Sequence, residues 1–269
     1  MTIARVFPRQ TSHTPNDSLA FTEPPGLFPP KVDQVHVSVA FTWDIPRAEE
    51  LAREWERVAP VQIGGPALGM RGDEFTPGLY LKKGVTITSR GCPNRCWFCS
   101  VWKREGTLRE LPIQDGWIVQ DDNILATSKE HFEAVCEMLK RQPKRARFTG
   151  GLEPALLTRW HAERLVALKP ETMWFACDTP EDEEPLHEAG KLMRDCGLSE
   201  KSHSLMCYVL IGYPKDTMDE AVRRLRFVRD AGFGPQAMLW RDNNGNANLE
   251  WKRFQRIWAR PSIVFSKGR

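Results

Sequence analysis

The sequence lacks any long apolar segment. Of its 269 residues, 41% are hydrophobic and 27% are charged, and charged residues and prolines interrupt every apolar stretch. A membrane-spanning helix needs about 20 consecutive, mainly apolar residues. The first ten residues, MTIARVFPRQ, also lack the apolar core of a secretory signal peptide. We therefore expect a cytoplasmic protein that does not associate with a membrane.

The sequence also lacks a strong charge bias and a regular series of cysteines. Its 38 basic and 35 acidic residues leave a net charge of +3, which does not indicate binding to nucleic acid. Of the seven cysteines, three stand close together and four are scattered, unlike the pattern of a disulfide framework. We therefore expect thiols in a reducing compartment, and the clustered cysteines are the candidates for function.

The clustered cysteines lie in residues 88–100, with the sequence TSRGCPNRCWFCS. Cys92, Cys96 and Cys99 have C-x3-C-x2-C spacing, and Phe98 directly precedes the last of them. Spacing this short lets one tight loop turn three thiolates toward a common centre. Cysteine thiolates hold iron–sulfur clusters, normally four to a 4Fe-4S cluster. Three ligands leave one iron open to a small chelating molecule, much as catalytic metal sites keep an open position.

This motif, placed after an apolar strand at residues 84–88, resembles that of the radical S-adenosylmethionine (SAM) superfamily. The resemblance implies that Cys92, Cys96 and Cys99 bind a 4Fe-4S cluster and that SAM chelates its fourth iron. It also implies that the reduced cluster cleaves SAM to methionine and a 5′-deoxyadenosyl radical, which abstracts hydrogen from a substrate. The expected cofactors are therefore the cluster and SAM, and the expected partners are an unidentified substrate and a one-electron reductant such as flavodoxin or ferredoxin.

A structural zinc site or an iron–sulfur sensing module is the alternative from a different class of protein. Zinc in a structural site takes four ligands. The nearest further candidates along the chain are His131 and Cys136, far downstream of the motif. The spacing and the aromatic residue favour the cluster over zinc.

From residue 85 onward, strand patterns alternate with helix patterns, which is typical of parallel βαβ units. We expect six strands, at about residues 85–88, 117–120, 146–149, 172–177, 205–211 and 236–240. The predicted helices include one with a capping box at Thr127 and Glu130, one with a box at Thr217 and Glu220, and a last one over about 248–258 that Pro261 ends. Six units match the partial (β/α)6, TIM-like barrel of the radical SAM family, over residues 85–242. Residues 243–269 are expected to form a C-terminal helix and tail.

Residues 1–84 are expected to form an N-terminal extension. The first 31 residues are rich in proline and predict an extended arm or an irregular loop packed on the main body, with a disordered tail as the alternative. Residues 34–65 predict a βαβ module, and residues 79–81 a short edge strand. The module resembles the last part of the cobalamin-binding domain that precedes many radical SAM cores. The cobalamin-ligand signature Asp-x-His-x-x-Gly is absent, so we interpret the module as a truncated remnant or as a structural extension of the barrel's sheet, with cobalamin binding as the minor alternative.

Polar residues follow the predicted strands at their carboxyl ends, where barrels of this kind gather their ligands. Asp121, Asp122 and Asn123 follow the second strand, where the family contacts the amino group of SAM. Carboxylates supply charge-assisted acceptors for an ammonium group, and a turn with a helix cap is the alternative for Asn123.

The third strand is followed by Gly150-Gly151-Leu152-Glu153, which looks like the Gly-Gly-Glu motif of the family one strand later than usual. Glycines there permit close approach of a ligand to the backbone. Glu153 is a candidate to bind SAM or substrate, or to favour a helix N-terminus.

Three further candidates follow the later strands. Asp178 is a candidate for the ribose hydroxyls of SAM, or for a helix cap. The run Gly212-Tyr213-Pro214-Lys215-Asp216-Thr217 resembles a motif of cobalamin-type and methylthio-transferring radical SAM proteins, in which an apolar residue of the strand, here Ile211 or Leu210, packs against adenine. Arg241 is a candidate for the SAM carboxylate or an acidic substrate, or for a surface ion pair. The isolated cysteines Cys136, Cys196 and Cys207 are interpreted as core thiols.

Overall fold

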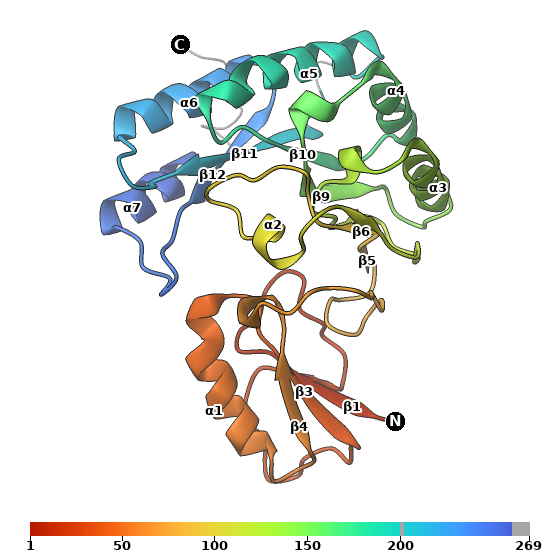
Figure 1. Cartoon of the computed structure of the whole chain (residues 1–269), viewed down its shortest axis with the longest axis vertical. Coiled ribbons are helices and arrows are strands. Elements are labelled where there is room, and N and C mark those ends of the chain that lie inside the picture. Colours follow the sequence, from red (N-terminus) through yellow and green to blue (C-terminus); the bar gives the residue numbers. More distant parts are fainter. Residues whose placement is uncertain (200–201, 260–269) are drawn as a thin grey trace. The chain divides into compact units, whose positions relative to one another are not determined.

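The computed structural model describes residues 1–199 and 202–259 of the chain. The chain forms two compact units: Met1–Gly116 with Asn243–Gly245, and Trp117–Asp242 with Asn246–Arg269 (Figure 1). The two units are described separately below. The predicted domain limits at residues 84 and 242 remain predictions.

The first unit is built on a small parallel sheet. Its strands lie in the order β2 (Ala20–Phe21), β1 (Ile3–Val6), β3 (Gln34–Ser38) and β4 (Val61–Gly64). Helix α1 (Ile45–Trp55) connects β3 to β4 and turns its apolar stripe toward the sheet. The core is closed by small and branched residues of the strands and by the helix: Ala4, Val6, Val35, Val37, Val39, Ala48, Leu51 and Trp55. The predicted βαβ module is therefore present.

One prediction for this unit is incomplete and another is wrong. Most of the first 31 residues are irregular, as one predicted alternative has it, but the prediction missed β1, which lies inside the sheet between β2 and β3. This strand could not be predicted from the sequence because it has only four residues and one of them, Arg5, is charged. That side chain is buried and donates to the carbonyl of Gly78 at 2.8 Å. Residues 79–81 form a turn and bend in place of the predicted edge strand.

The remainder of the first unit carries the cysteines. After β5 (Val85–Thr86), strand β6 (Ser89–Arg90) pairs antiparallel with β7 (Arg109–Glu110). The segment between these two strands holds the three clustered cysteines and a single helical turn, α2 (Val101–Arg104).

The second unit is a parallel α/β structure. Its strands lie in the order β12 (Gly234–Leu239), β11 (Leu205–Ile211), β10 (Thr172–Ala176), β9 (Arg147–Leu152) and β8 (Ile118–Val119). The registers of β8 with β9, β9 with β10, β10 with β11 and β11 with β12 are all parallel. The predicted α/β class with a parallel sheet is confirmed.

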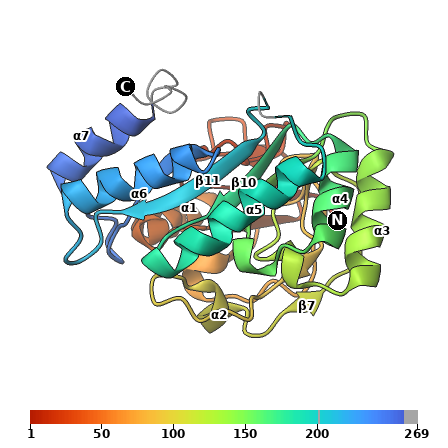
Figure 2. The same ribbon diagram turned by 90° about the horizontal axis from the view of Figure 1, so that it is seen from above.

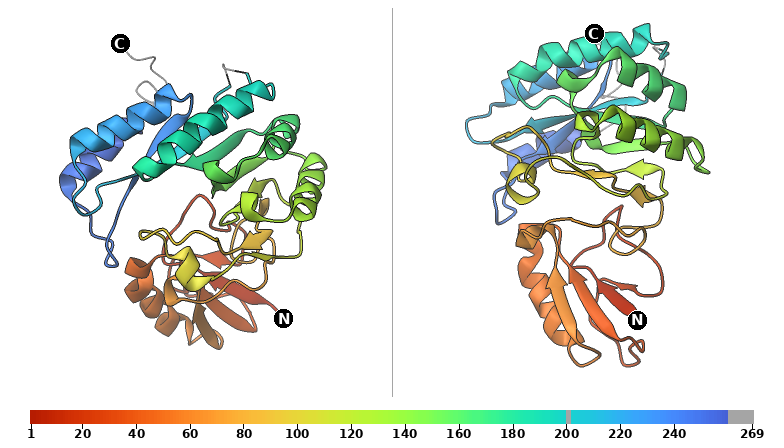
Figure 3. Two further views of the ribbon diagram at one scale, coloured as in Figure 1. Left: turned by 45° about the horizontal axis from the view of Figure 1, so that its top comes forward. Right: turned by 45° about the vertical axis from the view of Figure 1, so that its right-hand side comes forward.

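The helices of this unit connect successive strands: α3 (Lys129–Lys140), α4 (Arg159–Leu168), α5 (Glu183–Asp195) and α6 (Met218–Asp230), with α7 (Leu249–Trp258) after β12. Because each strand adds to the same side of its predecessor, right-handed crossovers place the connecting helices on one face. Figure 2 shows α5 and α6 side by side across β10 and β11, and Figure 3 shows the helices from two further directions.

Most helix beginnings follow from side-chain caps. Thr217 accepts from the N–H of Glu220 at 3.3 Å at the start of α6, as predicted. Helix α3 differs, because its cap is Ser128, which accepts from the N–H of His131 at 3.1 Å. The hydroxyl of Thr127, predicted to cap this helix, donates to the carbonyl of Ile124 at 2.7 Å.

The strand ends also differ in one place that matters for the site. Strand β9 continues to Leu152, so Gly150 and Gly151 belong to the strand and not to a loop after it.

Pro261, predicted to end the last helix, lies outside the described residues. Within residues 1–199 and 202–259, no helix combines the length and the apolar character that crossing a bilayer requires.

Candidate functional site

The cysteine loop lies between β6 and α2 and is held by short backbone contacts. The N–H of Cys99 donates to the carbonyl of Cys96 at 3.1 Å, which closes a turn around Trp97 and Phe98. The indole N–H of Trp102 donates to the same carbonyl, also at 3.1 Å. Cys96 and Cys99 are therefore carried by one tight turn, and Cys92 precedes it in the same short segment between β6 and α2.

The loop begins at a glycine that has a clear steric reason. Gly91 has φ +89°, and a Cβ atom there would lie 2.3 Å from the carbonyl oxygen of Thr107. Only glycine permits this backbone conformation and this close approach. The start of the cysteine loop is thereby packed against the segment that leads into β7.

The donor chemistry of the loop fits an iron–sulfur cluster. All three cysteines are thiols, and each is half-buried. The backbone N–H of Val101 points at the sulfur of Cys99, 3.5 Å away, and hydrogen bonds of this kind tune the sulfur ligands of clusters. In the described part of the chain, however, no group of three or more His, Cys, Asp or Glu side chains is arranged to hold a metal ion. The three thiolate donors are therefore present on one segment, but their side chains do not form a group arranged around a common centre.

Directly after α2 lies a buried carboxylate, Glu105, that the sequence analysis did not identify as a candidate. Glu105 is 3% exposed and pairs with Arg104 at 2.8 Å and with Arg109 at 3.2 Å. It also accepts from the N–H of Gly72 at 3.0 Å. Burial alone would raise the pKa of Glu105, but the hydrogen bonds from these groups and the charge of Arg104 outweigh it and hold the pKa below its ordinary value. This ionised carboxylate ties the segment after the cysteines to the loop before β5.

In the second unit, the predicted strand-end residues lie at the carboxyl edge of one parallel sheet. Asp121 and Asn123 follow β8 and are 2% and 3% exposed, and Asp122 between them is half-buried. A Cβ atom at Gly150 would lie 1.8 Å from the carbonyl oxygen of Asp121. Gly150 therefore serves the close packing of β9 on β8.

Gly151 and Glu153, the other two candidates of this motif, differ from Gly150. Gly151 has φ +100° and open space where a Cβ atom would be, so its backbone is accessible to a ligand. Glu153 directly follows β9, and its negative charge contributes to raising the pKa of Asp178. The structure therefore brings Glu153 and Asp178 near one another.

Asp178 lies just beyond β10 and bridges to the next strand. Its Oδ1 accepts from the backbone N–H of Leu210 at 2.8 Å. Burial raises the pKa of Asp178 to about 7, against the lowering effect of this hydrogen bond. A carboxyl group with this pKa is partly protonated at neutral pH, so it can donate to as well as accept from a sugar hydroxyl.

The motif after β11 is organised by a buried ion pair. Asp216 accepts from the N–H of Gly212 at 2.7 Å and pairs with Arg224 of α6 at 2.9 Å. The side chains are 0% and 2% exposed, respectively. Arg224 also donates to the carbonyl of Leu210 at 3.1 Å and lies over the ring of Tyr213 at 5.3 Å. The sequence did not identify Arg224, since an arginine in a helix normally indicates a solvated face.

The two apolar candidates of β11 face opposite sides. Ile211 is fully buried on the same face as Cys207 and Val209, whereas Leu210 is half-buried on the other face. That other face also carries Trp174 and Tyr208, whose rings stack at 4.5 Å. Arg241, after β12, is exposed.

The isolated cysteines are distinct from the cluster loop. Cys136, Cys177 and Cys207 are at most 1% exposed, and burial raises the pKa of Cys136 and of Cys177 to about 12. Thiols of this kind are inert at neutral pH. Cys196 is half-buried at the end of α5.

Phe98 and the clustered cysteines Cys92, Cys96 and Cys99 belong to the first unit. The second unit holds the candidates at the strand ends: Asp121, Asp122, Asn123, Gly150, Gly151, Glu153, Asp178, Ile211 and Arg241. Comparison of the chain with protein-family models and with curated protein sequences finds no match.

Proposed function

We propose that this chain is a radical SAM enzyme with one 4Fe-4S cluster, held by Cys92, Cys96 and Cys99. When bound and reduced, the cluster supplies the electron that cleaves SAM to methionine and a 5′-deoxyadenosyl radical, which abstracts hydrogen from the substrate. The single observation that carries the proposal is the C-x3-C-x2-C loop after an apolar strand, in which all three thiols are half-buried on one short segment.

The parallel βα units support the same proposal. We infer that they form the partial (β/α)6 barrel of the family, in which ligands bind at the carboxyl ends of the strands. In this proposal, the acidic residues after β8 and Glu153 accept hydrogen bonds from the amino group of SAM. Asp178 would bind the ribose hydroxyls, and Leu210 or Ile211 would pack against adenine.

Residues around these groups have supporting roles. Glu105 and its two arginines fix the segment that follows the cysteines. The Asp216–Arg224 pair fixes the backbone at the end of β11, because it holds both the carbonyl of Leu210 and the N–H of Gly212. The proposal includes a cytoplasmic location and a reductant such as flavodoxin or ferredoxin.

Cysteine variants test the proposal. The wild-type protein is reconstituted with iron and sulfide under anaerobic conditions, and iron, sulfide and visible absorbance are measured. Cys92→Ala, Cys96→Ala and Cys99→Ala are each expected to lose the cluster and the SAM cleavage that depends on it. Cys196→Ala is the matched control, because it removes a thiol of similar exposure and should retain both.

The alternative outcome is equally defined. One zinc ion per chain, unaffected by SAM and resistant to replacement by iron, would identify a structural Cys-metal module instead. Loss of the cluster in Cys196→Ala would show that the ligand assignment is wrong.

A further inference from the structure

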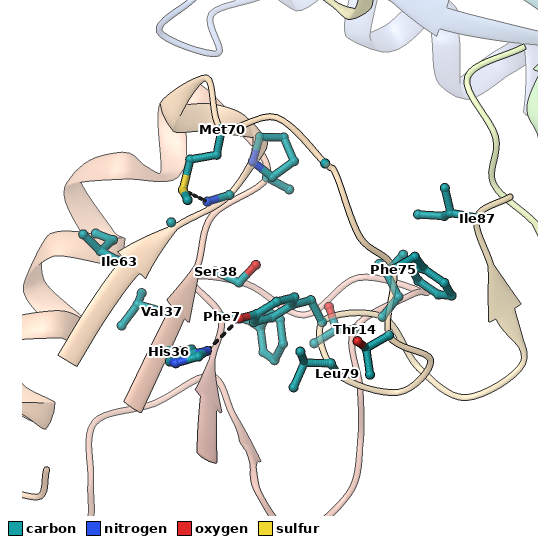
Figure 4. A pocket seen from close by; sticks show the side chains of 18 of the residues that line it. Phe7, Thr14, His36, Val37, Ser38, Ile63, Met70, Phe75, Leu79 and Ile87 are labelled. Carbon is teal, nitrogen blue, oxygen red and sulfur yellow. Dashed lines mark hydrogen bonds between the residues drawn. The ribbon is translucent and has the colours of Figure 1, made fainter. Parts of the chain in front are cut away.

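The first unit contains a cavity of about 610 Å³ to which the proposed function assigns no ligand. Its walls come from the carboxyl-terminal parts of β3 and β4, from the segments after β1 and β3, from the chain between Met70 and Leu81, and from Ile87, Arg90 and Glu105 (Figure 4). This volume is typical of sites for small molecules, which occupy about 300–1,000 Å³.

The position of the cavity follows from the topology of the sheet. With strands in the order β2-β1-β3-β4, the chain leaves β1 toward one side and leaves β3 toward the other. Parallel α/β sheets bind ligands outside the carboxyl ends of the strands at such a switch point. Phe7 and Arg9 follow β1 directly, Phe41 and Asp44 follow β3, and all four line the cavity.

The walls are unusually apolar for a surface that water can reach. Phe41, Ile63, Met70 and Tyr80 line the cavity and are 38%, 38%, 55% and 39% exposed. Exposed apolar side chains that form one contiguous patch often mark a binding site, whereas single scattered ones do not. In Figure 4, Ile63 and Met70 lie on one side of the space, and Phe75 and Ile87 lie on the other.

The charges of the walls compensate one another. Asp44 is 7% exposed and is bound by Arg9, with Nε and Oδ2 2.5 Å apart. Arg71 pairs with Asp73 at 3.2 Å, and Glu105 pairs with two arginines outside the cavity. The lining includes three arginines (Arg9, Arg71 and Arg90) and four acids (Asp44, Asp73, Glu74 and Glu105), so it offers no excess positive charge.

Two polar residues of the lining, His36 and Tyr80, are also uncharged near neutral pH. The imidazole Nδ1 of His36 lies 2.6 Å from the hydroxyl of Tyr80. Burial lowers the pKa of His36 and raises that of Tyr80. The pair therefore presents a neutral hydrogen-bonding group to a ligand.

The same site disfavours phosphate. In dinucleotide-binding sheets, phosphate groups sit at the N-terminus of the helix that follows a strand. Here Asp44 occupies the position before α1, so a phosphate would meet a carboxylate. The cavity therefore does not have the chemistry of a nucleotide site.

We propose that this cavity binds an uncharged, mainly apolar organic molecule that contains an aromatic ring. The rings of Phe7, Phe41 and Phe75 and the thioether of Met70 supply its apolar contacts, and the His36–Tyr80 pair supplies a polar one. This inference is independent of the proposed function, because it requires neither the cluster nor SAM.

Two fluorescent probes with one aromatic frame test the proposal. N-phenyl-1-naphthylamine is neutral, and 8-anilinonaphthalene-1-sulfonate carries a negative charge. Titration of the full-length protein should show saturable binding of one neutral probe per chain, with the sulfonate binding at least about tenfold more weakly. The net charge of +3 would by itself favour the sulfonate. A preference for the neutral probe therefore cannot come from the overall charge and is expected only of an uncharged, apolar site. No saturable binding, or equal binding of both probes, would overturn the proposal.

Variants locate the binding. The double change Ile63→Glu with Met70→Glu places charges on the wall and should weaken binding of the neutral probe by about tenfold or more. Leu27→Glu makes the same kind of change in the same unit at a side chain that is 93% exposed and outside the cavity. It should leave the affinity within about twofold, and an equal loss in this control would contradict the assignment.

Hydrogen exchange of the wild-type protein keeps the proposal falsifiable if the double variant fails to fold. The neutral probe should slow exchange in peptides that cover residues 62–81 and leave those covering 205–239 unchanged. Uniform slowing, or slowing only in the second set, would refute this location.

Discussion

Asp178 is the residue whose environment departs most clearly from that of an ordinary surface carboxylate. Its pKa is raised to about 7, mainly by burial, so the folded chain binds its proton more tightly than the unfolded chain does. A raised carboxyl pKa stabilises the fold fully at a pH below the unfolded value near 3.8, and this stabilisation is lost as the pH rises through about 7.

The variant Asp178→Asn isolates this effect, because its amide oxygen can still accept from the N–H of Leu210. The unfolding free energy of the variant relative to wild type should increase between pH 4 and pH 8, by up to about 4 kcal/mol. Urea unfolding at a series of pH values measures this difference. A difference that does not change with pH would show that Asp178 titrates like an exposed carboxylate.

The Asp216–Arg224 pair leads to a second prediction about single residues. Arg224→Met removes one partner of a fully buried ion pair and should lower the unfolding free energy by about 3 kcal/mol or more. The double variant Asp216→Asn with Arg224→Met should recover part of this loss, since it leaves no buried charge. Chemical denaturation of the three proteins measures both effects.

The neighbouring arginine is the control. Arg223 is 52% exposed and pairs with Glu183 at 2.8 Å, so Arg223→Met should cost less than about 1 kcal/mol. If Arg223→Met and Arg224→Met lowered the unfolding free energy equally, the burial of Arg224 would not explain its contribution to stability.

Functional side chains could be predicted where they belong to a sequence motif. They were missed where their burial and their partners depend on the tertiary structure. The sequence singled out Asp178 because a short polar residue followed a strand pattern. It did not reveal Arg224 or Glu105, because their partners come from other elements and their burial has no local signature. Ser128 was missed in favour of Thr127, since both are good caps and only the packing of α3 decides between them.

Among the elements, β8 and β9 are joined at a point that tolerates no side chain. A Cβ atom at Gly150 would lie within 1.8 Å of the Asp121 carbonyl, whereas one at Gly151 would meet open space. Gly150→Ala should therefore separate the strands and cost more than about 4 kcal/mol of unfolding free energy.

Gly151→Ala is the matched control, since its cost is only that of alanine at a positive φ, about 1–3 kcal/mol. Urea denaturation of the two alanine variants compares these costs directly. A larger loss at Gly151 than at Gly150 would contradict the steric explanation.

Element types were more predictable than element ends. Residues 205–211 form the strand that their apolar run predicts, and α7 begins and ends within a residue of its predicted range. Strand β1 was missed because four residues with a buried arginine show no alternation that exceeds background. The β6–β7 pair was missed because two-residue strands are defined by their partners and not by their own sequence.

At the scale of the whole chain, the alternation of strand and helix patterns predicted the parallel α/β class correctly. The predicted domain limits at residues 84 and 242 remain predictions, and the first of the two compact units ends at Gly116 before it resumes at Asn243–Gly245. The cysteine motif belongs to one unit and the polar strand ends to the other, and it is chemistry rather than any single contact that connects them in the proposal.

The proposed radical chemistry is tested by incubating the anaerobically reconstituted wild-type protein with SAM and dithionite and quantifying 5′-deoxyadenosine. This product should form in at least a stoichiometric amount, and Cys96→Ala should form none. A protein that carries its full complement of iron and sulfide and yet leaves SAM intact would rule out this function.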